Sequence, residues 1–153
     1  MSEAPHELSI TRLIKAAPET VYRVWTERLG EWWAPRPHTT PVVDIDFRPG
    51  GRARTVMKAP DGTELPNEGV VLEVVPNRKI VFTNAFKADW LPQDPFMVAI
   101  FTFEPEAGGT RYTARVRHWS ADVKQRHEAM GFEQGWGICA RQLAELAEAE
   151  PRH

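Results

Sequence analysis

The first fifty residues begin with an alternating pattern and then change to a helical one. Apolar and polar side chains alternate over 6–16, which predicts a first β-strand. Apolar residues then recur three or four positions apart over 18–27, and a proline at the first position is typical of a helix start. Leu29 and the pair Trp32-Trp33 predict a second short helical turn, which the next prolines end.

The middle of the chain returns to a two-residue period. We expect six further strands, at 41–47, 52–58, 69–75, 79–84, 97–103 and 110–119. Glycine, proline, aspartate and asparagine separate them, a pattern typical of an antiparallel meander. The segment 85–95 lacks this alternation, so we expect an irregular loop there.

Two of these strands show which of their faces is buried. In the last strand, arginines alternate with four other residues, so one face is predicted to point inward: Tyr112, Ala114, Val116 and His118. In the strand at 41–47, aspartates alternate with an apolar set that is expected inside: Val43, Ile45 and Phe47. The aspartates of that strand are then expected in solvent rather than in an acid–base pair.

A single long helix is predicted from 121 to 150, with Ser120 or Asp122 as its cap. One apolar stripe runs along it: Phe132, Trp136, Cys139, Leu143 and Leu146. The stripe should pack on the inner face of the sheet, which would bury Trp136. Three glycines lie in the first half of the helix: Gly131, Gly135 and Gly137. They indicate either close packing or a kink, or else room for a ligand beside Trp136.

Composition narrows the class of protein. A chain of 153 residues predicts one domain, with a core at about 7–149, and the formal net charge of −2 with no basic stripe argues against nucleic-acid binding. A single cysteine, no apolar run long enough to span a membrane, and no signal-peptide features at the start predict a cytoplasmic protein.

Few residues suggest reaction chemistry. The five histidines and one cysteine lack the spacing of a metal site, so no metal, no cofactor and no catalytic residue is assigned. Cys139 lies in the apolar stripe and is expected to be a buried, inert thiol rather than a nucleophile paired with His118 or His127. His118 ends the inward face of its strand. It is either a hydrogen-bonding or acid–base group at a cavity mouth, or a histidine satisfied by a carbonyl.

Large rings are the strongest functional signal. The chain has six tryptophans, seven phenylalanines and two tyrosines. Nine of these stand in predicted strands, helices or their connections: Trp25, Trp33, Phe47, Phe82, Trp90, Phe101, Phe103, Tyr112 and Trp136. They indicate a core of large side chains, the wall of a pocket, or both.

Several short motifs, in this order, resemble the family named after the activator of the heat-shock-protein-90 ATPase, within the START-like (SRPBCC) superfamily. They are Trp32-Trp33-Ala34-Pro35, the run from Asp46 to Gly51, Met57-x-x-Pro60-Asp61-Gly62, Gly69-x-x-Leu72-Glu73-Val74, Thr110 and Gly135-Trp136. The resemblance implies an α+β helix-grip fold. In that fold a curved antiparallel sheet of six or seven strands surrounds a long C-terminal helix, with two short helices after the first strand and a hydrophobic cavity between.

The expected function is therefore binding of a hydrophobic or aromatic small molecule in that cavity. Two alternatives stay open: an enzyme of the cyclase, hydrolase or isomerase type in the same cavity, and a chaperone-associated or stress-related interaction module. A homodimer is also left open. The predicted pocket residues are Trp33, Phe47, Met57, Phe82, Phe101, Tyr112, Val116, His118, Met130, Gln134 and Trp136. His118, Tyr112 and Gln134 would supply the polar contacts.

Overall fold

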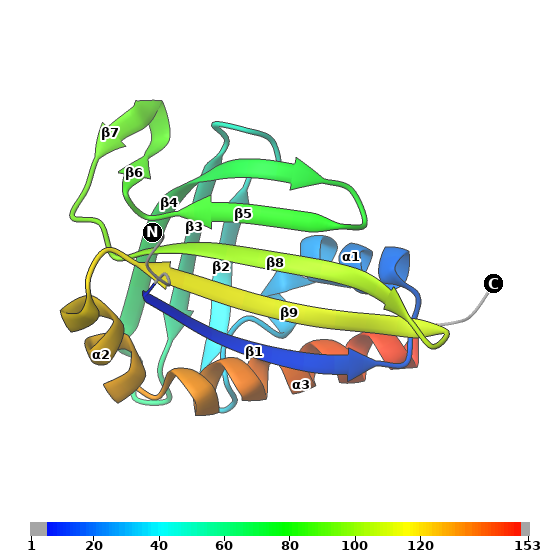
Figure 1. Cartoon of the computed structure of the whole chain (residues 1–153). Coiled ribbons are helices and arrows are strands. Elements are labelled where there is room, and N and C mark those ends of the chain that lie inside the picture. The colour runs from blue at the N-terminus through cyan, green and yellow to red at the C-terminus, as the bar shows by residue number, and fades with distance from the viewer. Residues whose placement is uncertain (1–5, 151–153) are drawn as a thin grey trace.

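The computed structural model describes residues 6–150 as a curved sheet with helices on its concave side (Figure 1). Seven antiparallel strands form the sheet in the order β1-β9-β8-β5-β4-β3-β2. Their bounds are β1 His6–Ile14, β2 Thr39–Ile45, β3 Arg52–Lys58, β4 Glu64–Val75, β5 Lys79–Thr83, β8 Met97–Glu106 and β9 Gly109–His118. The α+β helix-grip prediction is confirmed. The strands occur where the two-residue period predicts them, although β4 begins earlier than expected.

The segment predicted as a loop contains a small hairpin of its own. Strands β6 (Phe86–Lys87) and β7 (Leu91–Pro92) pair outside the main sheet. The one-turn helix η2 (Ala88–Trp90) connects them, and two of its residues have positive φ. Strands of two residues are too short to show alternation, which is why the sequence did not reveal them.

The inward face predicted for β9 is confirmed, because Tyr112, Ala114, Val116 and His118 are all buried. The prediction for β2 is wrong at Val43, which is 39% exposed. A register shift interrupts β2 between Thr39 and Val42, and β2 is an edge strand of the sheet. An irregularity changes which side chains share a face, and an edge strand has a neighbour on one side only.

Four helical segments complete the described chain. Helix α1 (Pro18–Glu27) and the turn η1 (Leu29–Glu31) follow β1, as predicted, and α2 (Ala121–Ala129) and α3 (Phe132–Ala149) follow β9. Ser120 caps α2 by accepting a hydrogen bond from the Val123 amide at 3.3 Å. No helix within residues 6–150 combines the length and the apolar character needed to cross a bilayer.

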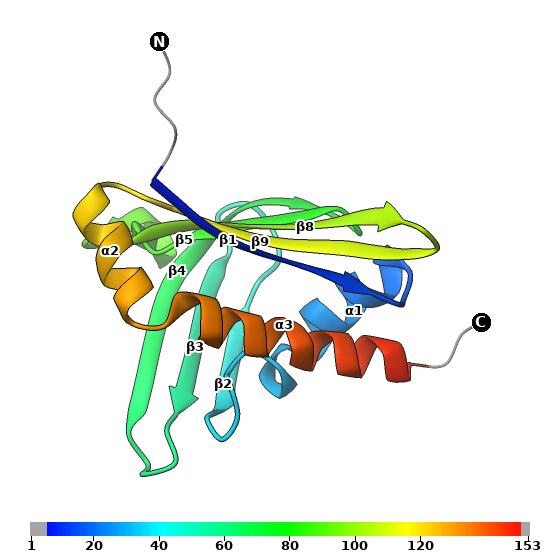
Figure 2. The same cartoon turned by 60° about the horizontal axis from the view of Figure 1, so that its bottom comes forward.

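The long C-terminal helix is present, but the prediction that it runs unbroken from 121 to 150 is wrong. The helix breaks after Met130, and Gly131 has φ +89°, in the left-handed region where glycine is favoured. Helix α3 therefore has 18 residues and spans about 27 Å. Figure 2 shows α3 running along the open side of the sheet, with α2 turned away from it at one end.

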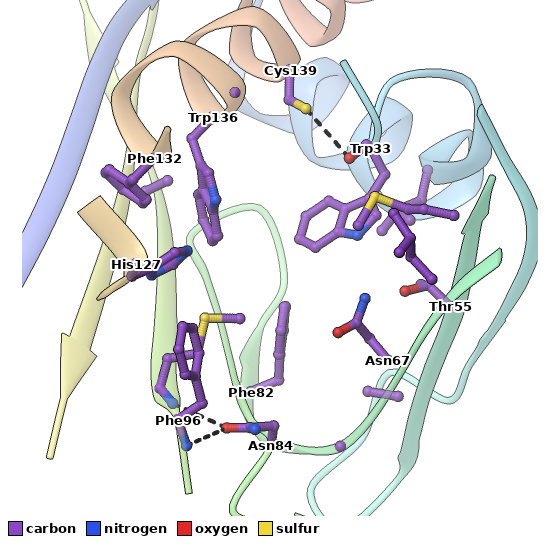
Figure 3. A pocket seen from close by; sticks show the side chains of 18 of the residues that line it. Trp33, Thr55, Asn67, Phe82, Asn84, Phe96, His127, Phe132, Trp136 and Cys139 are labelled. Atoms are coloured by element: carbon purple, nitrogen blue, oxygen red, sulfur yellow. Dashed lines mark hydrogen bonds between the residues drawn. The ribbon is translucent and has the colours of Figure 1, made fainter. Parts of the chain in front are cut away.

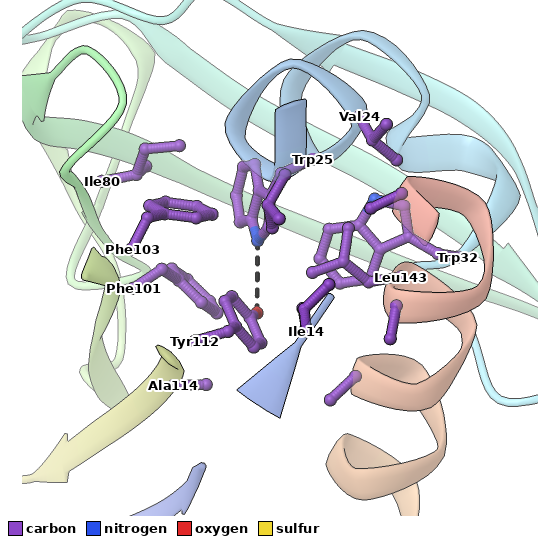
Figure 4. Packing of buried hydrophobic residues seen from close by; sticks show 14 of the residues in the cluster. Ile14, Val24, Trp25, Trp32, Ile80, Phe101, Phe103, Tyr112, Ala114 and Leu143 are labelled. Carbon is purple, nitrogen blue, oxygen red and sulfur yellow. Dashed lines mark hydrogen bonds between the residues drawn. The ribbon is translucent and has the colours of Figure 1, made fainter. Parts of the chain in front are cut away.

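A cluster of buried side chains fills the region where α1 meets the sheet and α3 (Figure 4). The fully buried Trp25 of α1 lies there, with its ring centroid 5.0 Å from Phe101 and 5.3 Å from Trp32. Its indole N–H donates to the Tyr112 hydroxyl at 3.2 Å. Leu143 of α3 closes the cluster from the helix side. This end of the domain is solidly packed.

Candidate functional site

A cavity of about 570 Å³ lies at the other end, between the sheet and the first half of α3 (Figure 3). Four large rings form much of its wall: Trp33, Phe82, Phe101 and Trp136. Met130 and Leu65 also line it and are 75% and 40% exposed, so they mark its opening to solvent. The volume lies within the range of small-molecule sites.

The rings of the wall pack against one another. Phe101 and Trp136 are parallel, with an interplanar angle of 1° and centroids 5.9 Å apart. Phe82 stacks on Phe101 at 5.4 Å. Trp33 comes from the segment after η1, and its centroid lies 6.1 Å from Trp136. Offset and tilted contacts of this kind are favoured between aromatic side chains, so the wall is a continuous aromatic surface.

A glycine of α3 helps to keep the cavity open. Gly135 lines the cavity, and a Cβ placed on it would meet no atom within 4 Å. Gly137 has equally open surroundings but does not line the cavity. The two interpretations of the helix glycines apply to different residues. Gly131 lies at the kink, whereas Gly135 leaves room beside Trp136.

A buried glutamine holds the tryptophan segment against α3. Gln142 is 2% exposed and donates to the carbonyls of Trp32 at 3.0 Å and Ala34 at 2.9 Å. Its side-chain oxygen accepts from the Arg36 amide at 3.1 Å. Satisfying three buried backbone groups fixes Trp33 at the cavity wall. Our sequence reading missed this residue, although it stands three positions after Cys139 on the buried stripe.

Two ionisable groups of the wall stay protonated at neutral pH. Burial raises the pKa of the Cys139 thiol to about 12, and the thiol donates to the Trp33 carbonyl at 3.3 Å. Burial also raises the pKa of Tyr112 well above its usual range. Both groups line the cavity without placing a charge in it.

Two histidines from different elements meet beside the cavity. His118 ends β9 and His127 lies on α2; they are 7% and 6% exposed. Nε2 of His118 lies 2.9 Å from Nδ1 of His127, and Nδ1 of His118 lies 2.9 Å from the His6 carbonyl. Burial, and then the neighbouring His118, lowers the pKa of His127 to about 4.

His127, not His118, reaches the cavity wall. Its ring packs between Phe96 and Phe132, with centroid distances of 4.9 and 5.1 Å. The sequence analysis did not assign His127 or Phe96 to the pocket. The sequence left two alternatives for His118: a functional group at the cavity mouth, or a histidine hydrogen-bonded to a carbonyl. The second describes the contact of its Nδ1 atom with the His6 carbonyl. Residues 6–150 contain no cluster of three or more side chains that could hold a metal ion.

Seven of the eleven predicted pocket residues line this cavity: Trp33, Met57, Phe82, Phe101, Tyr112, Met130 and Trp136. Trp136 is only partly buried, so the expectation of full burial is wrong; one side of its ring faces the open space.

Four predicted pocket residues lie elsewhere. Phe47 packs on Trp25, with ring centroids 6.0 Å apart. Val116 is fully buried but does not line the cavity. His118 is hydrogen-bonded behind His127. Gln134 is exposed and lines a smaller hollow of about 250 Å³.

Comparisons with known proteins agree with this architecture. The family described as Activator of Hsp90 ATPase homolog 1-like protein matches residues 15–148. A solved protein from Nitrosomonas europaea is 36% identical, covering 95% of this chain and 96% of that one, with a TM-score of 0.89.

Two further solved structures are similar over nearly the whole chain. A protein from Mycobacterium smegmatis is 27% identical, with 97% and 94% coverage and a TM-score of 0.81. A Silicibacter pomeroyi protein that bears the name AHSA1 is 28% identical, with 94% and 99% coverage and a TM-score of 0.72. No functionally curated protein matches the sequence.

Proposed function

We propose that this chain, which belongs to the Activator of Hsp90 ATPase homolog 1-like family, binds a hydrophobic or aromatic small molecule in the cavity between the sheet and α3. The observation that carries the proposal is the open space of about 570 Å³ bounded by large rings. Burying apolar ligand surface there contributes about 25 cal/mol per Å² before the costs of association.

The charge state of the wall favours an uncharged ligand. Tyr112 and Cys139 stay protonated, and His127 stays neutral above its lowered pKa. The carboxylates that line the cavity, Glu64 and Glu68, are exposed, and Glu68 pairs with an arginine of β3. A base with a pKa as low as that of His127 removes protons poorly at neutral pH, which supports binding over the enzyme alternative.

The experiment uses one glycine that lines the cavity and one that does not. We expect the neutral dye N-phenyl-1-naphthylamine to bind the protein at about one molecule per chain, with rising fluorescence. Gly135→Leu places a side chain into the cavity and should weaken binding at least about tenfold, since even partial loss of the apolar contact exceeds 1.4 kcal/mol.

Gly137→Leu is the matched control, because the same residue is added to the same helix away from the cavity wall. It should bind the dye as the unchanged protein does. Saturable binding that Gly135→Leu leaves intact would place the dye elsewhere and contradict the proposal, as would a protein that binds no dye.

A further inference from the structure

The two buried histidines form a hydrogen-bonded chain with a fixed direction. The His6 carbonyl can only accept, so Nδ1 of His118 is the donor in their 2.9 Å contact. A neutral imidazole carries one N–H, so Nε2 of His118 accepts from Nδ1 of His127, also at 2.9 Å. Nε2 of His127 is then left without a hydrogen and can only accept.

The imidazole of His127 is in surroundings that keep it neutral. Both histidine rings are more than nine-tenths buried, and burial disfavours the imidazolium form of His127. The ion pairs found within residues 6–150 involve neither ring. The groups that pack on His127 from α3 and from the segment before β8 are the aromatic rings of Phe132, Trp136 and Phe96.

The free acceptor is on the cavity side of this chain. His127 lines the cavity, and the close-up view shows its ring at the edge of the open space, facing the side where Trp136 and Phe82 lie (Figure 3). No residue within 6–150 hydrogen-bonds its Nε2 atom, although its Nδ1 atom is fully used. Nε2 of His127 is not among the fully enclosed side-chain atoms that lack a partner within residues 6–150, so it is open to the cavity, and a ligand that donates to it adds a hydrogen bond.

We propose that the ligand is a neutral aromatic compound with a phenol-type hydroxyl, which donates a hydrogen bond to Nε2 of His127. This inference rests on the proposed function, since it assigns the ligand class of the same cavity. An aromatic hydroxyl points its O–H outward in the plane of the ring. An aromatic body packed against the cavity wall beside Trp136 and Phe82 can therefore direct the O–H to the cavity edge. Ethers and carboxylates present only acceptors to the lone pair of Nε2 and are disfavoured.

The experiment compares 2-naphthol with 2-methoxynaphthalene, which keeps the same rings but lacks the hydroxyl hydrogen. Calorimetric titration at pH 7.5 should show 2-naphthol binding about tenfold more tightly, the usual effect of one added hydrogen bond. The anion 2-naphthoate should bind more weakly than either.

A conservative variant tests the contribution of the acceptor atom, Nε2 of His127, to this preference. His127→Asn keeps an N–H donor where Nδ1 faces His118 but has no atom at the position of Nε2. The preference for 2-naphthol over the ether should fall to less than about twofold. His38→Asn makes the same change outside the cavity wall and should leave the preference unchanged.

A second measurement needs no variant. Nitrogen-15 NMR of the free protein at pH 7.5 should show an unprotonated Nε2 on His127, whose signal moves with 2-naphthol but not with the ether. A protonated Nε2, or a preference abolished by Thr55→Val on the cavity wall but not by His127→Asn, would overturn the inference. Equal binding of alcohol and ether inside the cavity overturns this inference alone, whereas no binding of any probe overturns the proposed function with it.

Discussion

The two halves of α3 face the same sheet and have opposite surroundings. The second half contributes Leu143, Ala144 and Ala147, all buried in the core. The first half contributes Gly135 and the partly buried Trp136 to the wall of a cavity. The sheet is rich in large side chains under both halves, so its composition alone does not decide which end is hollow.

The two ends differ in which segments and side chains lie between α3 and the sheet. At one end α1 enters this space and Trp25 fills it, with five aromatic ring contacts and a hydrogen bond to Tyr112. At the other end no segment within residues 6–150 enters, and α3 presents a glycine (Figure 2). Phe101 and Tyr112 belong to both the core and the cavity wall, so they mark the boundary. One fold thus combines a packed half that supplies stability with a hollow half free to bind.

The largest expected effect tests the packed half. Trp25→Ala removes the central ring of the core and should lower the free energy of unfolding by about 3–5 kcal/mol, as for other buried tryptophans. Trp136→Ala should cost less than half as much, because its ring already borders open space. Urea unfolding followed by circular dichroism measures both. Equal losses would mean that the two halves are packed alike.

The second-largest expected effect is a pH dependence of the free energy of unfolding, which comes from His127 in the hollow half. The folded-state pKa of His127 is about 4, below its ordinary value near 6.5, so the unfolded chain binds more protons between these values. This contribution to stability is complete above pH 6.5 and is lost as the pH falls towards 4. The slope is about 1.4 kcal/mol per pH unit, or roughly 3 kcal/mol in all.

The measurement is the free energy of unfolding from pH 7.5 to 4, for the unchanged protein and for His127→Asn. The difference between the two gives the contribution of His127, because the other titrating groups are common to both. The difference between the curves should be steepest inside the window. A constant difference across the window would mean that His127 titrates normally and is not held neutral by burial.

A smaller effect separates two glycines of the hollow half. Gly131→Ala forces a Cβ into a left-handed conformation, with φ +89°, and should cost about 1–2 kcal/mol. Gly135→Ala lies in regular helix with open space around its Cβ, so it should stabilise by up to about 1 kcal/mol. Thermal unfolding of both variants should therefore shift in opposite directions. Shifts of the same sign would contradict the break between α2 and α3 or the open space beside Gly135.

The smallest effect compares Gly135→Ala with Gly137→Ala. Both add one methyl group to helix α3 and should gain similar stability, because both sites are open. Only the first methyl group enters the cavity, so the Kd of N-phenyl-1-naphthylamine should change for Gly135→Ala and stay constant for Gly137→Ala. Equal changes in Kd would show that the cavity does not distinguish the two positions.

The sequence by itself determined the elements whose pattern is local. Alternation in β9 correctly identified its inward face, and Pro18 marked the start of α1. These predictions succeed because a side chain's direction follows from the strand period, and because proline suits the first turn of a helix. The prediction of α3 was correct in phase but not in length, since a glycine that ends a helix and a glycine that merely weakens one look the same in sequence.

Only the tertiary structure decided the site. His118 and His127 are nine positions apart in the chain, yet their contact depends on how α2 folds back over the end of β9. Phe47 follows β2 and Gln134 lies in α3, and both elements border the cavity, but the two side chains point to the core and to the surface. A cavity is space that no side chain fills, and a local pattern records only the side chains that are present. Its position therefore follows from how distant elements pack.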